Sequence, residues 1–124
     1  MSSRLILQLA ALLGALSVAI GAFGAHRLKP LLTANGHLDT FETAVRYQFY
    51  HVLALLAVGV LAQARPELRG SLGTTAVLWL AGMVIFSGSL YAICFTDISK
   101  FGAVAPVGGV LLIAGWVRLA LISY

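Results

Sequence analysis

Long apolar runs separated by short polar segments dominate this chain. Four such runs cover residues 5–25, 39–64, 72–95 and 103–122, the second opening with one polar turn. Each is close to the ~20 residues that an α-helix needs to cross ~30 Å of hydrocarbon. None alternates apolar and polar positions, as spanning strands would. The pattern predicts an all-α fold, a four-transmembrane-helix antiparallel bundle that runs up-down-up-down as one domain over residues 1–124.

The segments between the runs carry the residues that break helices. The longest, residues 26–43, contains Pro30 and Gly36 and is expected to be a loop. Residues 65–71 and 96–100 form two shorter turns. All four carboxylates of the chain lie in these segments or at helix ends, which leaves the middle of each predicted span without an acid.

Composition supports a membrane protein. Of 124 residues, 60% are hydrophobic and 10% are charged, and the mean hydropathy is +0.99. A soluble domain of this size has too much surface for its volume to hide so much apolar sequence, so the lipid bilayer is the expected surrounding. The net charge of +4 is scattered between the apolar runs, which favours fixing of topology over binding to nucleic acid.

Topology is expected to place both termini on one side, because the number of crossings is even. The first run, residues 5–25, is longer than the ~7–15 apolar residues of a signal peptide, so we expect a retained helix. Lys and Arg are almost evenly divided. The terminal side carries Arg4, Arg65, Arg69 and Arg118, and the other side carries Arg27, Lys29, Lys100 and Arg46. We expect the termini to be cytoplasmic.

Small residues mark the faces on which membrane helices approach each other closely. The expected packing positions are Gly14, Gly21, Gly24, Gly82, Gly88, Gly108, Gly109 and Gly115. Plain helix packing is the simpler interpretation of this set, and a glycine face that lines a ligand passage is the alternative.

Polar side chains within the runs gather at the end opposite the termini. They are His26, Tyr47, Gln48, His51, Ser87, Ser89 and Tyr91. Tyr47, Gln48 and His51 share a helix face, and His51 lies roughly 10 Å inside the apolar boundary at Ala44. Polar groups at that depth avoid lipid and seek partners within the bundle. The cluster is either a structural hydrogen-bond network or a pocket that binds a ligand or partner or handles protons.

Catalytic chemistry has little support in the sequence. The single cysteine, Cys94, lies in an apolar run and fits an inert packing residue. His26 and His51 lack an aligned acidic or cysteine ligand, and no histidine is spaced to activate a nucleophile. We therefore expect no catalytic residue, no metal and no cofactor.

Several sequence blocks together resemble a known family. They are Gly21–His26, Tyr47-Gln48 with His51, Phe86–Tyr91, Pro106–Gly109 and Gly115-Trp116. In this order they resemble the DUF 423 family of small bacterial membrane proteins, to which transmembrane protein 256 is a similar eukaryotic form. Ala105 stands where the family would have threonine. The resemblance implies four membrane helices in a bacterial inner membrane, and it implies no established activity.

Three classes of function remain open. The first is a non-enzymatic module that binds a partner protein, a lipid or a small apolar, quinone-like molecule at the polar cluster. The second is a homo-oligomeric transporter or channel for a small solute or protons, although proton coupling usually uses a carboxylate in mid-membrane. The third is a membrane enzyme, which would need a metal or a nucleophile.

Overall fold

The computed structural model describes residues 1–124 and contains helices and turns only. The four long helices are α1 (Ser3–Ala25), α3 (Leu38–Ala64), α4 (Arg69–Thr96) and α5 (Ala105–Ala120). A short helix, α2 (Lys29–Ala34), and two 3-10 turns, Pro66–Leu68 and Ser99–Ala103, connect them. All four spans are long and apolar enough to cross a membrane, α5 together with the turn before it. The predicted all-α, four-span fold is confirmed.

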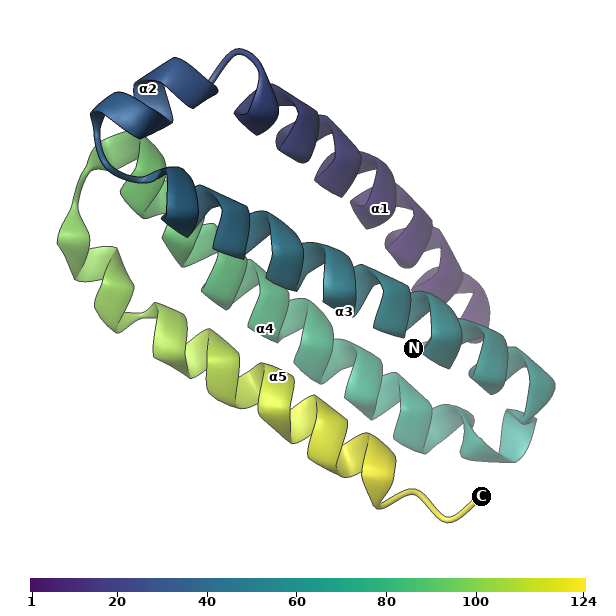
Figure 1. Cartoon of the computed structure of the whole chain (residues 1–124). Coiled ribbons are helices and arrows are strands. Elements are labelled where there is room, and N and C mark those ends of the chain that lie inside the picture. Colours follow the sequence, from purple (N-terminus) through teal and green to yellow (C-terminus); the bar gives the residue numbers. More distant parts are fainter.

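Each long helix runs antiparallel to the next long helix of the chain, and both termini lie at the same end (Figure 1). The main contacts join α1 to α3, α3 to α4, and α4 to α5. Helices α1 and α5 therefore lie on opposite sides of the central α3/α4 pair. Helices α1 and α4 make few backbone contacts, and so do α3 and α5. Side chains therefore determine how the space between each of these pairs is filled.

The structure differs from the sequence prediction mainly where proline begins a helix. Within the expected loop of residues 26–43, Pro30 occupies the first turn of α2. Pro106 occupies the first turn of α5, which begins at Ala105 rather than at residue 103. The missing N–H of proline costs little there, because the first amides of a helix have no intrahelical partner. Helix α4 also begins earlier than expected, at Arg69 instead of residue 72.

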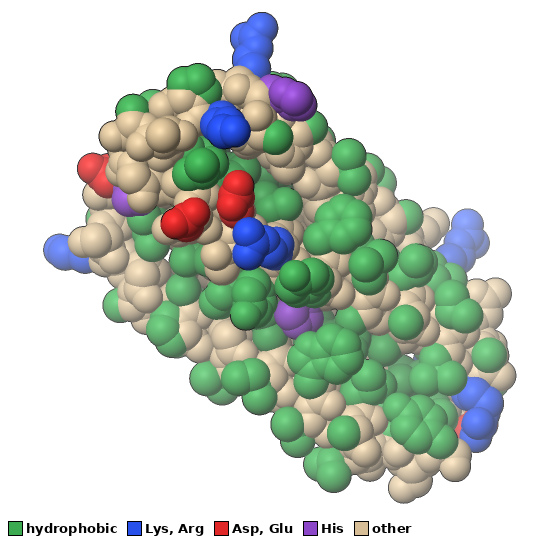
Figure 2. Space-filling view, in the orientation of Figure 1, with side chains coloured by type: hydrophobic (Ala, Val, Ile, Leu, Met, Phe, Trp, Pro, Cys, Tyr) green, Lys and Arg blue, Asp and Glu red, His purple; other side chains and the backbone are tan.

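The interior has one large and one small apolar cluster. The large one lies toward the terminal end and contains Trp79, Leu55 and Leu72, each fully buried. The small one joins Leu32, Phe41 and Cys94 beneath α2, so Cys94 is a buried packing residue. Figure 2 shows Lys, Arg, Asp and Glu mostly toward the two ends, with a hydrophobic band between them. This distribution suits a molecule surrounded by lipid.

Four of the expected packing glycines lie where a side chain would collide with a neighbour. A Cβ atom at Gly24, Gly82, Gly108 or Gly115 would overlap Phe41, Leu112, Phe86 or Trp79, respectively. The nearest atom would be at 3.5 Å for Gly14, 3.4 Å for Gly21 and 3.8 Å for Gly109, which is ordinary to slightly tight contact. Gly88 differs from the expectation, because nothing lies within 4 Å of its Cβ position. Gly59, which the sequence did not single out, packs tightly on Leu7.

The turn between α2 and α3 is hydrogen-bonded to the C-terminal end of α4. His37 Nε2 lies 2.6 Å from the Asp97 carboxylate, and Asn35 Nδ2 donates to the Cys94 carbonyl at 3.3 Å. The Cys94 thiol points back at the His37 carbonyl, 3.6 Å away. Asp97 has a φ of 57°, a left-handed residue that ends the helix. These contacts fix the non-terminal end of the bundle.

Candidate functional site

A chain of hydrogen-bonded polar side chains joins three helices in the half of the bundle away from the termini. Gln48 of α3 donates from Nε2 to the Ser17 hydroxyl of α1 at 2.9 Å. Its Oε1 accepts from the Tyr91 hydroxyl of α4 at 2.7 Å. Ser17 in turn donates to the Leu13 carbonyl at 2.7 Å. Gln48 is only 6% exposed, so this amide links α1, α3 and α4 from the interior.

The same amide forms part of the floor of a groove between α1 and α4. The groove has a volume of about 390 Å³, and Gln48, Ser87 and Tyr91 supply its polar groups. Its walls are hydrophobic side chains of the two helices: Leu9, Leu13, Leu16 and Ile20 on α1, and Leu80, Met83 and Val84 on α4. Gly88 also lines it, which explains the open space beside that glycine. Gly88 therefore widens a groove instead of packing on a helix.

The floor keeps some hydrogen-bonding capacity after its internal bonds are made. Ser87 donates to the Ala44 carbonyl at 2.8 Å, and its oxygen can still accept. The Gln48 amide has two N–H groups and uses one of them on Ser17. The Tyr91 oxygen donates its proton to Gln48 and retains its lone pairs. These groups lie beneath the groove, whose open surface is almost entirely apolar.

His51 lies on the part of α3 that faces α5. Its Nδ1 is 2.7 Å from the Tyr47 carbonyl, which only accepts, so Nδ1 carries the proton. Its Nε2 is 3.0 Å from Trp116 Nε1, which only donates, so Nε2 is the acceptor. This pairing makes His51 a neutral imidazole of one fixed tautomer. A proton on Nε2 would oppose the Trp116 N–H, so the geometry ties α5 to α3 and leaves no nitrogen free.

The remaining expected site residues are placed separately. His26 is exposed at the C-terminal end of α1 and its side chain makes no hydrogen bond. Tyr47 is 43% exposed on the α3/α5 side, with its ring 4.9 Å from that of Phe86. Ser89 bonds to the Ile85 carbonyl of its own helix. The predicted cluster is therefore divided between the α1/α4 groove and the α3/α5 side, and two of its members join neither network.

Two residues of these networks, Ser17 and Trp116, were not predicted as site residues from the sequence. Ser17 stood in an apolar run and was visible only as a small residue four positions before Gly21. Trp116 carried a signal of its own, because a buried or lipid-facing indole N–H usually finds an acceptor. Neither partner could be assigned, since the bonds join residues 31 and 65 positions apart. No three His, Cys, Asp or Glu side chains lie close enough together to hold a metal ion.

Comparison with known proteins matches this chain to one family. The family model described as "Protein of unknown function (DUF423)" covers residues 20–109. The chain belongs to the DUF423 family. A UPF0382 membrane protein of Staphylococcus saprophyticus is 42% identical over 95% of both chains. The UPF0382 membrane protein YwdK of Bacillus subtilis is 40% identical, covering 94% of this chain and 93% of its own. No solved structure matches the chain.

This DUF423 protein is a small integral membrane protein. The UPF0382 inner membrane protein YgdD of Escherichia coli is 39% identical over 94% of this chain and 86% of its own length, and the helices described above have spanning length. The resemblance drawn from the sequence blocks is thereby confirmed. The family match includes Gln48, Ser87 and Tyr91 of the groove floor, whereas Ser17 lies before its first residue.

Proposed function

We propose that this DUF423 protein is a non-enzymatic binding module whose α1/α4 groove holds a small apolar molecule. The observation that carries the proposal is a groove of about 390 Å³ whose open surface is almost entirely apolar. Sites for small molecules in proteins are mostly apolar hollows of roughly 300–1,000 Å³ with a few polar groups that orient the ligand. The size and the lining of this groove fit that description.

The position of the groove favours a ligand that arrives from the bilayer. Its walls belong to two spanning helices, and the residues that line its sides are hydrophobic. The polar atoms of Gln48, Ser87 and Tyr91 contribute almost nothing to the open surface of the groove, so its hydrophobic walls supply the contact with the ligand.

Binding has more support than conduction through a homo-oligomer. The carboxylates Asp39, Glu42, Glu67 and Asp97 lie in the first turn or two of a helix, in a turn or at a helix end, away from the middle of the spans. Both ring nitrogens of His51 are occupied. No buried side-chain polar atom is left without a partner, which suits a closed bundle better than a hydrated path.

Filling the groove tests the proposal. Gly88→Leu adds a side chain where nothing lies within 4 Å, so the bundle can form while the groove is blocked. We expect mass spectrometry of organic extracts from the purified protein to find an apolar molecule with the wild type. Its occupancy should fall at least fivefold in Gly88→Leu.

The matched control is Gly70→Leu, which adds the same side chain to the same helix at another open position outside the groove. It should retain the molecule at the wild-type level. Equal occupancy in all variants, or no molecule in the wild type, would overturn the proposal. If the wild type instead copurifies with another protein or with a second copy of this chain, and Gly88→Leu abolishes that association, the groove binds a helix of the partner.

We also propose that both termini face the cytoplasm. At the terminal end, Arg4, Arg69 and Arg118 lie in the first or last turn of a helix and Arg65 lies in a turn, whereas Arg46 of the opposite side lies two turns inside α3 and pairs with Glu42 at 3.4 Å. The segments at that opposite end therefore contribute Arg27, Lys29 and Lys100. Orientation follows Lys and Arg and largely ignores acids. A C-terminal reporter that is active only in the cytoplasm should be active, and a reporter active only outside it should be silent.

A further inference from the structure

A second groove lies between α4 and α5 at the terminal end of the bundle. It has a volume of about 780 Å³ and is separate from the α1/α4 groove. Its walls are formed by Leu78 of α4 and by Val110, Ile113, Ala114 and Val117 of α5. Its polar groups, the side chains of Ser71, Arg118 and Ser123, lie near the helix ends. The groove thus has an apolar length and one polar, basic mouth.

The dimensions of this groove match one leaflet of a bilayer. Val110 and Arg118 both line it and are eight residues apart on α5, which corresponds to about 12 Å along the helix axis. Half of the hydrocarbon core is about 15 Å thick. Arg118 is in the last turn of α5, at the end of the bundle that also carries Arg65 and Arg69. An acyl chain entering at the surface would end near the middle of the bilayer.

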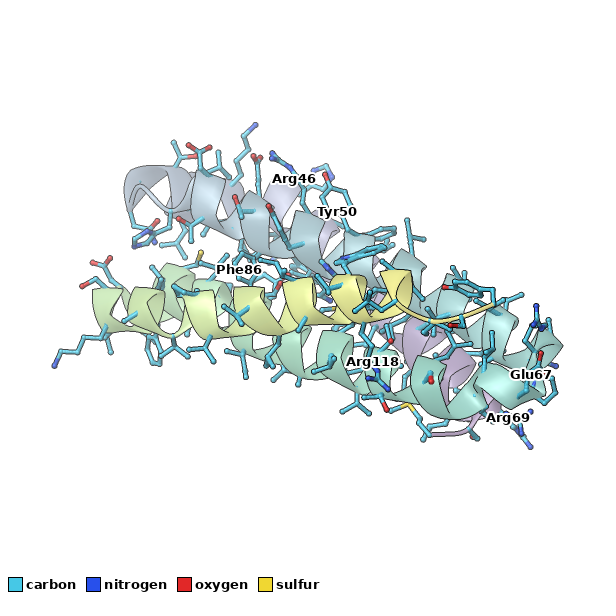
Figure 3. All side chains as sticks on the ribbon, turned by 90° about the horizontal axis from the view of Figure 1, so that it is seen from below. Arg46, Tyr50, Glu67, Arg69, Phe86 and Arg118 are labelled. Carbon is cyan, nitrogen blue, oxygen red and sulfur yellow. The ribbon has the colours of Figure 1, made fainter.

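The charge at the mouth is not neutralised by the protein. The carboxylates that contact a basic side chain do so at His37, Arg46 and Arg65, and no carboxylate lies within 4.0 Å of Arg118. The acid at this end, Glu67, is bound by Arg65. In Figure 3, Arg118 lies on the α4 side of α5, toward the end that carries Arg69. A guanidinium in this position is a ready partner for a phosphate.

From this geometry we propose that the α4/α5 groove binds an anionic phospholipid of the terminal-side leaflet. One acyl chain lies against Val110, Ile113 and Val117, and the phosphate accepts hydrogen bonds from Arg118 and the hydroxyls of Ser71 and Ser123. No acid lines the groove, so nothing holds the ammonium group of a zwitterionic headgroup. The basic pocket at the other end, which contains Lys29 and Arg46, also contains Glu42 and is less suited to an anion.

Native mass spectrometry of the whole protein in detergent tests the site. The probes are phosphatidylglycerol and phosphatidylethanolamine with identical acyl chains. We expect the wild type to bind phosphatidylglycerol about fivefold more tightly, the factor that corresponds to about 1 kcal/mol per basic residue. Arg118→Gln should bind the two lipids equally, and Arg118→Lys should keep part of the preference, because it retains the charge but not the fork of donors.

Two further variants separate the groove from general charge. Arg27→Gln removes the same charge from the opposite end, and it should leave the preference unchanged. Ala114→Phe fills the groove while Arg118 stays in place, and it should weaken the binding of both lipids. The site is refuted if Arg118→Gln keeps the preference or if Arg27→Gln loses it equally. Displacement of phosphatidylglycerol by glycerol phosphate would also refute the site, because the headgroup alone would then account for the binding and the acyl chain would not need the groove.

Discussion

Gly108→Ala should destabilise this DUF423 protein by about 3 kcal/mol or more, at the upper end of the range for an overpacked core. A Cβ atom at this position would overlap the backbone of Phe86 and would lie 2.8 Å from its Cα atom. A side chain can rotate away from such a contact, but the backbone of a neighbouring helix cannot. Helices α4 and α5 would have to separate. Reversible unfolding in detergent, followed by circular dichroism, measures the loss.

The neighbouring glycine provides the matched control. At Gly109 the nearest atom to an added Cβ is Phe86 Cδ2 at 3.8 Å, which is ordinary contact. Alanine is also the better helix former by about 1 kcal/mol, so Gly109→Ala should be neutral or slightly stabilising. Gly88→Ala, in open space, should behave in the same way. Equal losses at Gly108 and Gly109 would show that the close approach to Phe86 is not what limits the substitution.

Trp79→Ala should cost about 3–5 kcal/mol, the usual range for removing a fully buried large aromatic side chain. Trp79 is fully buried in α4, donates from Nε1 to the Leu112 carbonyl at 3.2 Å, and packs against Gly115. Its removal leaves a cavity between α4 and α5 and removes one interhelical hydrogen bond, although the Leu112 carbonyl keeps its partner within α5. The free energy of unfolding in detergent is again the quantity to measure.

Trp116 is the natural comparison, because its ring lies only 4.7 Å from that of Trp79. It is 47% exposed and makes one interhelical hydrogen bond, to His51. Such bonds in membrane proteins are worth about 0.6–2 kcal/mol, so Trp116→Ala should cost clearly less than Trp79→Ala. If the two substitutions cost the same, the assignment of Trp79 to the packed core and Trp116 to its edge is incorrect.

The number and approximate ends of the spans were predictable because the thickness of a bilayer sets the length of an apolar run. The short helix α2 was missed for a physical reason as well. Pro30 was interpreted only as a breaker, although proline in the first turn of a helix is favourable. Local sequence signals therefore located the long helices but not the short element whose Leu32 packs on Phe41 at the non-terminal end.

The division of the polar residues was not predictable from one helix alone. Gln48 and His51 are three residues apart, which places them about 60° apart around α3. That angle is small enough for both to share a helix face. It is also wide enough for Gln48 to bond to α1 and α4 while His51 bonds to α5. Only the positions of the neighbouring helices decide which partner each side chain meets.

The packing of each long helix on its successor affects how the chain can be made. Because α1 contacts α3, and α3 contacts α4, each partner emerges from the ribosome directly after the helix it must join. The α1–α3 hairpin can enter the bilayer and pair before α5 has been synthesised. The bonds from His37 to Asp97 and from His51 to Trp116 close later, as the second hairpin arrives. Insertion and folding can therefore proceed together, from the N-terminus to the C-terminus, without rearrangement of the first pair.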